Sequence, residues 1–124
     1  MSEKQKLLIV DDSELNRDIL KEILGSRYDY MEAENGTQAI QILEVHPEID
    51  LMLLDINMPQ MNGFQVLEHM RELQWIDEVP VVMISSEESV EIMRKAYDLG
   101  ITDYISRPFD AVIVKKRVQN TLGL

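Results

Sequence analysis

Short apolar runs alternate along the chain with longer segments in which apolar residues recur at helical spacing. A polar loop follows each short run, and five such pairs can be distinguished. The pattern predicts strands over residues 6–10, 28–33, 51–54, 81–84 and 101–105. The third and fourth of these are apolar on both faces, which is typical of central parallel strands.

The segments between the strands carry helix start and stop signals. Ser13 is expected to cap a helix that ends near residue 24, where Gly25 can adopt the left-handed conformation. Thr37 is expected to cap a second helix through about residue 45, before His46-Pro47 blocks its continuation. Three further helices are predicted over residues 64–73, from about 89 to 100, and from the N-cap Asp110 to about 122.

Strands that alternate with helices require crossover connections, which are right-handed and place helices on both faces of a parallel sheet. The chain is therefore predicted to be a doubly wound α/β domain with five strands and five helices. No repeat, low-complexity stretch or linker divides it, so residues 1–124 are expected to form a single domain.

Composition and charge remove several classes of function. The absence of cysteine excludes disulfides, cysteine-ligated metals and a cysteine nucleophile, and is compatible with a reducing compartment such as the cytoplasm. A net charge of −11 opposes binding to nucleic acid or to anionic lipid surfaces. The longest apolar runs are four residues long, far short of a membrane span.

Polar residues follow the predicted strands at their carboxyl ends, where ligands bind in doubly wound folds. Asp11-Asp12 follow the first strand, Asp55 the third and Ser85 the fourth, while Arg107 lies just after the fifth. Each carboxylate alone could cap a turn or a helix, but three at one sheet edge favour a site. Oxygen ligands suit Mg²⁺, beside which one carboxylate can act as a nucleophile toward phosphorus while Ser85 and Arg107 stabilise the transferred group.

The same residues resemble the receiver domain of bacterial two-component response regulators. The resemblance covers essentially the whole chain and rests on four motifs, the longest of which is Leu53-Leu54-Asp55-Ile56-Asn57-Met58-Pro59-Gln60-Met61-Asn62-Gly63. The others are Leu8-Ile9-Val10-Asp11-Asp12, Ile84-Ser85-Ser86 and Asp103-Tyr104-Ile105-Ser106-Arg107-Pro108-Phe109.

The resemblance implies a flavodoxin-like sheet of order 2-1-3-4-5 and a cytoplasmic phosphoacceptor regulator rather than an enzyme with a separate substrate. Asp55 would accept a phosphoryl group from a sensor histidine kinase or a phosphotransfer protein. Mg²⁺ would be held by Asp12, Asp55 and the backbone carbonyl of Asn57, with Asp11 acting largely through water. A cis Arg107-Pro108 bond would direct Arg107 toward Asp55.

The resemblance also implies a switch. Ser85 would move toward the phosphoryl group, the ring of Tyr104 would turn inward, and a surface of the fourth helix, fifth strand and fifth helix would change. This surface would serve an output domain, a partner protein or a second copy in a homodimer. In the fourth helix, one line holds Val90, Met93 and Tyr97 and another holds Ile92, Ala96 and Leu99, so either one line is free for a partner or both are buried.

Arg107 departs from the family pattern, which usually has lysine before this proline, and the two cations are not interchangeable at a phosphate site. A degenerate receiver that acts only as an interaction platform is therefore one alternative. An aspartate-nucleophile phosphohydrolase of the haloacid dehalogenase type and a flavodoxin-like carrier are others, although Asp55-Ile56-Asn57 and Asp11-Asp12 fit those classes poorly. Two alternatives stay open for the extent of the protein: a stand-alone regulator, and a longer multidomain regulator of which this chain is the N-terminal part. The last helix, which would run naturally into a connector, favours the longer protein.

Overall fold

The computed structural model describes residues 4–58, 61–86 and 89–123, so Pro59 and Gln60 of the longest motif lie outside it. Strands and helices alternate throughout the described chain, with a short 3-10 helix, η1, after the first helix. The elements are β1 (Lys6–Val10), α1 (Glu14–Leu24), η1 (Gly25–Arg27), β2 (Asp29–Ala33), α2 (Gly36–Val45), β3 (Leu51–Asp55), α3 (Gly63–Glu72), β4 (Val81–Ser85), α4 (Val90–Asp98), β5 (Asp103–Ser106) and α5 (Ala111–Thr121).

The five strands form one parallel sheet of order β2-β1-β3-β4-β5, which confirms the predicted fold and strand order. The register pairs Val10 of β1 with Leu54 of β3, and Asp55 with Ile84 of β4. Because all strands run the same way, their carboxyl ends meet at one edge of the sheet. The residues that follow β1, β3, β4 and β5 are therefore neighbours.

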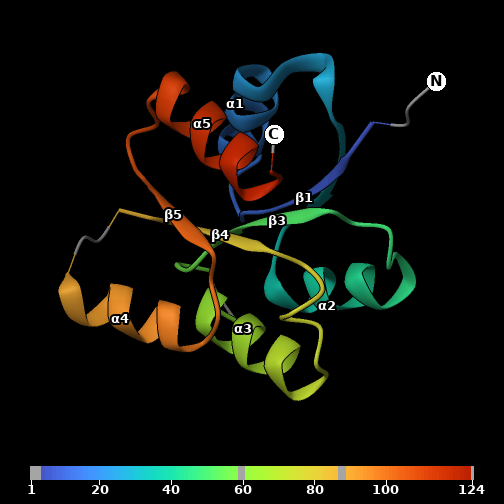
Figure 1. The fold of residues 1–124 in the computed structure, drawn as a ribbon, viewed down its shortest axis with the longest axis vertical. Helices are drawn as coiled ribbons and strands as arrows, with labels where there is room; N and C mark the ends of the chain where they lie inside the picture. Colours follow the sequence, from blue (N-terminus) through green and yellow to red (C-terminus); the bar gives the residue numbers. More distant parts are fainter. Residues whose placement is uncertain (1–3, 59–60, 87–88, 124) are drawn as a thin grey trace.

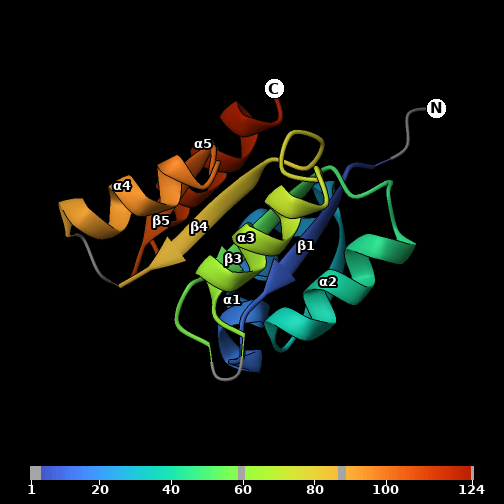
Figure 2. The same ribbon diagram turned by 90° about the horizontal axis from the view of Figure 1, so that it is seen from below.

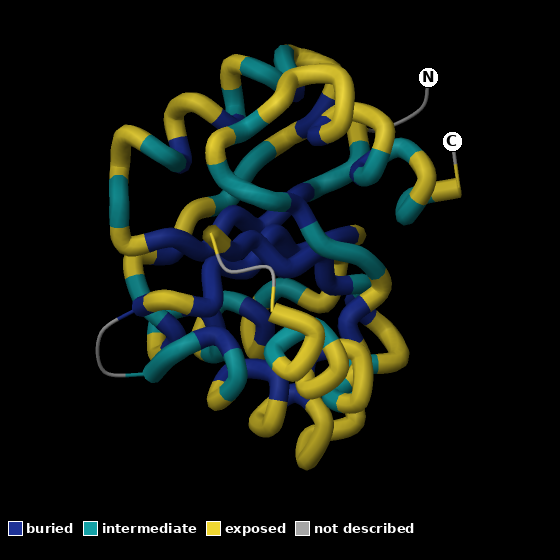
Figure 3. Tube along the Cα trace, turned by 90° about the vertical axis from the view of Figure 1, so that its left-hand side faces the viewer, coloured by how far each residue is buried: buried dark blue, intermediate teal, exposed yellow. Residues whose placement is uncertain are grey.

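Helices cover both faces of the sheet. Helices α1 and α5 lie on one face and α2, α3 and α4 on the other, as Figures 1 and 2 show from two directions. Alternate strand residues point to opposite faces and divide the core into two clusters. Figure 3 shows the resulting buried layer in the middle of the molecule. Among the described residues, no helix is long and apolar enough to cross a membrane.

Four of the helix starts that the sequence indicates are observed, and one is wrong. Ser13 and Asp110 cap α1 and α5 as predicted, and α4 starts near residue 89 as predicted, with Ser89 as its cap. Each of the three side chains accepts a hydrogen bond from a backbone N–H of the first turn. Helix α3 begins at Gly63, one residue before the predicted segment, and Asn62 caps it in a capping box with Gln65.

The wrong start is Thr37, because α2 begins at Gly36 and Asn35 is its N-cap. The Asn35 side chain accepts from the backbone N–H of Gln38 at 2.9 Å. Gly36 can occupy the first position because it has no Cβ, which would lie only 2.7 Å from the carbonyl oxygen of Met61. Two cap-forming residues lie within three positions here, so the local sequence alone does not choose between them.

Two strands begin later than predicted. Strand β2 begins at Asp29 because Tyr28 ends the 3-10 helix η1. Strand β5 begins at Asp103, since the N–H of Ile101 donates to the Ala96 carbonyl at the end of α4 instead of joining the sheet. At the other end, β3 and β4 each extend one residue further than predicted, to Asp55 and Ser85.

Helix α4 settles the question of its two apolar lines. Ala96 is fully buried, and Ile92 and Leu99 pack against the core cluster on that face. On the other line, Val90 is 64% exposed and Tyr97 is 44% exposed. Only the first line is therefore buried in the domain, which leaves Val90 and Tyr97 open at the surface.

Candidate functional site

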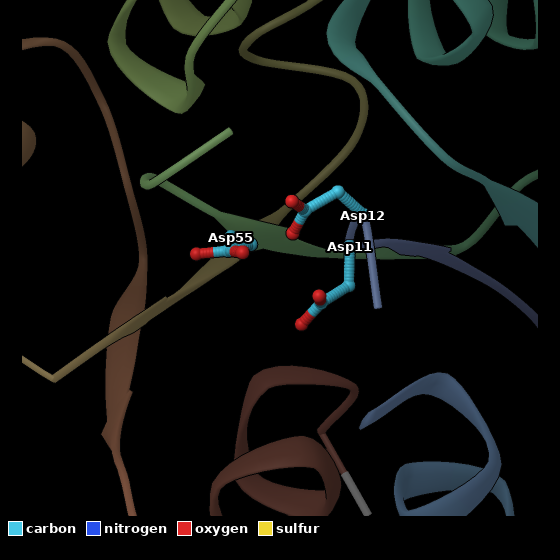
Figure 4. A group of neighbouring side chains, drawn as sticks. All are labelled: Asp11, Asp12 and Asp55. Atoms are coloured by element: carbon cyan, nitrogen blue, oxygen red, sulfur yellow. The ribbon is translucent and has the colours of Figure 1, made fainter. Parts of the chain in front are cut away.

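Three carboxylates meet at the carboxyl edge of the sheet, as the sequence predicts. Asp11 and Asp12 follow β1, and Asp55 is the last residue of β3. One carboxylate oxygen of each lies within 4.8 Å of the others. Figure 4 shows the three side chains reaching from these neighbouring strand ends toward a common space. Oxygen donors at this spacing fit the ligand preference of Mg²⁺.

Asp11 is fully buried and is held on both carboxylate oxygens. Its Oδ1 accepts from the backbone N–H of Ser13 at 2.9 Å, and its Oδ2 accepts from Nη2 of Arg107 at 2.5 Å. A buried charge needs an ionic partner or several hydrogen bonds, and Asp11 has both. The side chain of Asp11 is therefore fixed from two directions.

Asp55 is also buried, with 1% of its surface exposed. Its Oδ1 accepts from the backbone N–H of Asn57 at 3.0 Å, and its Oδ2 lies 3.3 Å from Nη2 of Arg107. Burial raises the pKa of Asp55 above its ordinary value, and the nearby charge of Asp11 raises it further. The Asn57 N–H and Arg107 act in the opposite direction without overcoming the burial.

Arg107 brings a cation to the acidic cluster. The Arg107-Pro108 peptide bond is cis, as predicted. The guanidinium contacts both Asp11 and Asp55 through Nη2, whereas the expectation named Asp55 alone as its target. The Nε atom is buried and has no hydrogen-bond partner among the described residues.

Ser85 and Tyr104 occupy different places relative to the acidic cluster. Ser85 ends β4 beside β3, is buried, and its carbonyl accepts from the N–H of Arg107 at 3.1 Å. Tyr104 lies within edge strand β5, half-buried against the core, with the guanidinium carbon of Arg117 5.2 Å from its ring centre. Arg117 also donates to Asp103 at 2.6 Å, which fastens α5 to β5 beside the tyrosine.

Arg17 is a residue near the site that the sequence analysis missed. It is only 8% exposed and donates from Nη1 to the backbone carbonyl of Asp11 at 2.6 Å. A signal was present, because Arg17 shares the buried stripe of α1 with Leu20 and Leu24, where a charged residue needs a partner.

The two histidines do not take part in the acidic cluster. His46 caps the end of α2 and contacts Glu48 at 3.0 Å, and His69 is exposed on α3. Neither belongs to the acidic cluster found among the described residues.

Comparison with known proteins gives one consistent result. A family model described as the response regulator receiver domain matches residues 7–119. A chemotaxis protein CheY homolog of Campylobacter jejuni is 32% identical over 120 residues, which cover 95% of this chain and 92% of that protein. A probable cyclic di-GMP phosphodiesterase of Vibrio cholerae is 34% identical over 116 residues, covering 94% of this chain and 26% of that protein. Among solved structures, chemotaxis protein CheY4 of Vibrio cholerae has a TM-score of 0.88 and 27% identity, with 96% of this chain and 99% of that chain covered.

Proposed function

Because this chain belongs to the response regulator receiver family, we propose that it works as a phosphoacceptor module in which Asp55 receives the phosphoryl group. The observation that carries the assignment is the position of Asp55, which is buried at the end of β3 and close to both the other two carboxylates and Arg107. The phosphohydrolase and flavodoxin-like alternatives lose their support, since neither is the family that matches.

In the proposed step, an oxygen of Asp55 attacks the phosphorus of a phosphohistidine on a kinase or phosphotransfer protein. The oxygen–phosphorus bond forms while the nitrogen–phosphorus bond breaks, and the bonding electrons return to the imidazole of the donor. The N–H of Asn57 holds the carboxylate in a fixed orientation during the attack. Arg107 can then donate to an oxygen of the transferred group.

We assign the carboxylates of Asp11, Asp12 and Asp55 and the backbone carbonyl of Asn57 as the Mg²⁺ ligands, with Asp11 acting largely through water. Mg²⁺ would supply positive charge between these carboxylates and the phosphoryl oxygens. The spacing of the three carboxylates supports this assignment. Asp11 and Asp55 already share Arg107, so the guanidinium must give up part of that contact when another cation enters.

A donor protein needs surface close to Asp55 on which to dock. Leu15, in the first turn of α1 directly after the Asp11-Asp12 pair, is 68% exposed. An exposed leucine in the helix that follows the acidic pair offers apolar contact area on the side of the domain that carries the acceptor. It supports transfer from a protein donor rather than from a small metabolite alone.

The signal is proposed to leave through α4, β5 and α5, with Ser85 and Tyr104 as the switch pair. Exposed Val90 and Tyr97 on α4 and exposed Ile113 on α5 provide apolar surface for an output domain, a partner protein or a second copy of the chain. Tyr104 lies between these helices on β5, so a change in its ring position reaches both of them.

The extent and location of the protein are also proposals. We assign residues 1–124 to one receiver domain that acts in the cytoplasm and can form the N-terminal part of a longer regulator. The partial coverage of the Vibrio cholerae phosphodiesterase supports a longer protein, because there a similar sequence makes up 26% of the chain.

Intact-mass measurement after incubation with acetyl phosphate and Mg²⁺ tests the acceptor. The parent should gain one phosphoryl mass, and Asp55→Asn should gain none. Asp77→Asn is a matched control, because Asp77 is exposed in the loop before β4, at the opposite edge of the sheet. A phosphoryl mass on Asp55→Asn would refute the assignment.

The degenerate receiver is the second candidate, and one observation favours it. Arg107 already pairs with Asp11 at 2.5 Å, so the cation expected to meet the phosphoryl group is engaged elsewhere. A platform protein would keep the fold and the exposed faces of α4 and α5 but would gain no mass from acetyl phosphate.

A further inference from the structure

Arg17 links the turn that carries the acidic pair to the neighbouring strand. Strands β1 and β2 pair as far as Val10 and Ala33. Just beyond that point the N–H of Asp11 donates to the Ala33 carbonyl at 3.1 Å. The guanidinium of Arg17 adds two bonds, from Nη1 to the Asp11 carbonyl at 2.6 Å and from Nε to Oε1 of Glu32 at 3.0 Å. Glu32 belongs to β2, so a single buried side chain on α1 joins three elements next to the site.

Glu32 is itself held in place by a second cation. Lys21, one turn further along α1, donates to Oε2 of Glu32 at 3.0 Å and also contacts Asp18 at 3.4 Å. These cations hold the pKa of Glu32 below its ordinary value against the opposing effect of its burial. Glu32 is therefore a charged, oriented acceptor for Arg17, and the orientation of Arg17 is set from β2.

The turn needs such a brace because its side chains repel one another. Asp11, Asp12 and Asp55 bring three carboxylates within 4.8 Å, and like charges at that range favour any movement that separates them. Asp11 and Asp12 are consecutive, so rotation of the peptide between them would move both side chains together. Arg17 holds the carbonyl of that peptide.

We infer that Arg17 is a positioning residue for the cation site, fixing the Asp11–Asp12 peptide so that both carboxylates point toward Asp55. The inference rests on the proposed function in one respect, namely that these carboxylates bind Mg²⁺. Arg17 does not contact the cation. It acts through the backbone of Asp11. In many metal sites, residues that do not bind the metal orient its ligands by hydrogen bonds in the same way.

A general charge effect of Arg17 and a positioning role predict opposite changes in Mg²⁺ affinity when Arg17 is replaced. Removing a positive charge near an anionic site strengthens Mg²⁺ binding by simple electrostatics. Releasing the Asp11–Asp12 peptide weakens it, because the carboxylates must be reassembled around the ion. The sign of the change in affinity therefore separates a positioning role from a general charge effect.

Calorimetric titration of the folded protein with Mg²⁺, at a temperature well below the unfolding midpoint, tests the inference. Arg17→Met should weaken Mg²⁺ binding by about tenfold, a typical loss when an outer orienting group is removed. Lys21→Met is the matched control, since it removes one positive charge and one bond to Glu32 without touching Asp11. It should leave the dissociation constant unchanged or lower it.

Two further variants keep the test decisive if Arg17→Met folds poorly. Arg17→Lys keeps the charge but cannot span both acceptors, so it should also weaken Mg²⁺ binding. Glu32→Gln keeps the Arg17 bond to Asp11 and should have a smaller effect than either. Amide exchange of Ser13, whose N–H donates to Asp11, should rise in the Arg17 variants without metal.

The outcomes are distinct. Suppose that Arg17→Lys and Arg17→Met bind Mg²⁺ as tightly as Lys21→Met does and differ only in a lower unfolding temperature. This result would overturn the positioning role of Arg17 and leave the proposed function intact. A parent that binds no Mg²⁺ would overturn both.

Discussion

Arg107 is bound more closely to Asp11 than to Asp55. Its Nη2 atom lies 2.5 Å from Oδ2 of Asp11 and 3.3 Å from Oδ2 of Asp55. The residue that should meet an incoming phosphoryl group is thus bound to a different carboxylate. Phosphorylation of Asp55 must therefore draw the guanidinium of Arg107 away from Asp11, a buried partner, and this movement has a free-energy cost.

The first prediction concerns this exchange of partners. The parent should bind beryllofluoride, a mimic of the phosphoryl group, in the presence of Mg²⁺, and Arg107→Lys should bind it more readily because an ammonium adapts more easily to a single oxygen. Arg107→Ala should bind the mimic more weakly than the parent by roughly tenfold or more, the value of a charged hydrogen bond. It should still bind Mg²⁺, since arginine cannot ligate a metal.

Fluorine NMR titration of the three proteins measures this order of affinity. Arg94→Lys, an exposed position on α4, is a control for the same exchange away from the site. The parent would be identified as a degenerate receiver if it binds Mg²⁺ but does not respond to beryllofluoride, and if Arg107→Lys restores the response.

Asp12 should make the metal-free protein less stable. Asp12→Ala relieves repulsion within the acidic cluster, so its unfolding temperature should exceed that of the parent when EDTA is present. Mg²⁺ at 100 times its dissociation constant should raise the free energy of unfolding of the parent by about 2.7 kcal/mol. For Asp12→Ala, most of this increase should be lost. Thermal unfolding with and without Mg²⁺ gives both values, and equal gains would show that Asp12 is not a ligand.

Asp55 should make stability depend on pH in the metal-free protein. Its pKa in the folded state is raised above the ordinary 3.8, mainly by burial. Its contribution is therefore fully present below pH 3.8 and is lost as the pH rises through the raised pKa. Asp55→Asn cannot ionise, so its advantage in unfolding temperature over the parent should be larger at pH 7 than at pH 4. Calorimetry in EDTA measures the difference at each pH, and an advantage independent of pH would contradict the raised pKa.

Arg117 should hold the ring of Tyr104 in its resting position. Its guanidinium carbon lies 5.2 Å from the ring centre while Nη1 donates to Asp103. Arg117→Ala should cost about 0.5–1 kcal/mol of stability, the value of an exposed cation–π contact. It should also shift the aromatic NMR signals of Tyr104 toward those of the protein bound to beryllofluoride. Lys116→Ala, an exposed neighbour on α5, should leave these signals unchanged, and so would Arg117→Ala if the contact did not matter.

Sequence patterns predicted the fold and the acidic cluster because both follow from local rules. Runs such as Leu51–Leu54 are apolar on both faces, which assigns them to the centre of a parallel sheet. The carboxyl ends of such strands lie at one edge of the sheet, so proximity of Asp11, Asp12 and Asp55 at that edge follows from the strand assignment. No knowledge of packing was needed for either step.

The errors arose where distant contacts decide between similar local choices. Asn35 and Thr37 are both good caps, and the local sequence does not choose between them. Arg107 could reach either of two carboxylates, and the strand order does not say which one a long side chain prefers. The partners of buried Arg17 are separated from it in sequence, by 15 residues for Glu32, so a local pattern could not name them.

Helix α4 needs only one of its sides to stay attached to the domain. The helix packs on the core through Ala96, Ile92 and Leu99. The side chains of Val90 and Tyr97 are exposed and add little to this packing. Substitutions at surface positions of this kind usually change stability by less than about 0.5 kcal/mol. Residues on the outer side of α4 can therefore change during evolution to fit a new partner, while the acidic cluster and the sheet stay the same. After gene duplication, two copies of the domain can then differ in the partner they bind before they differ in the reaction at Asp55.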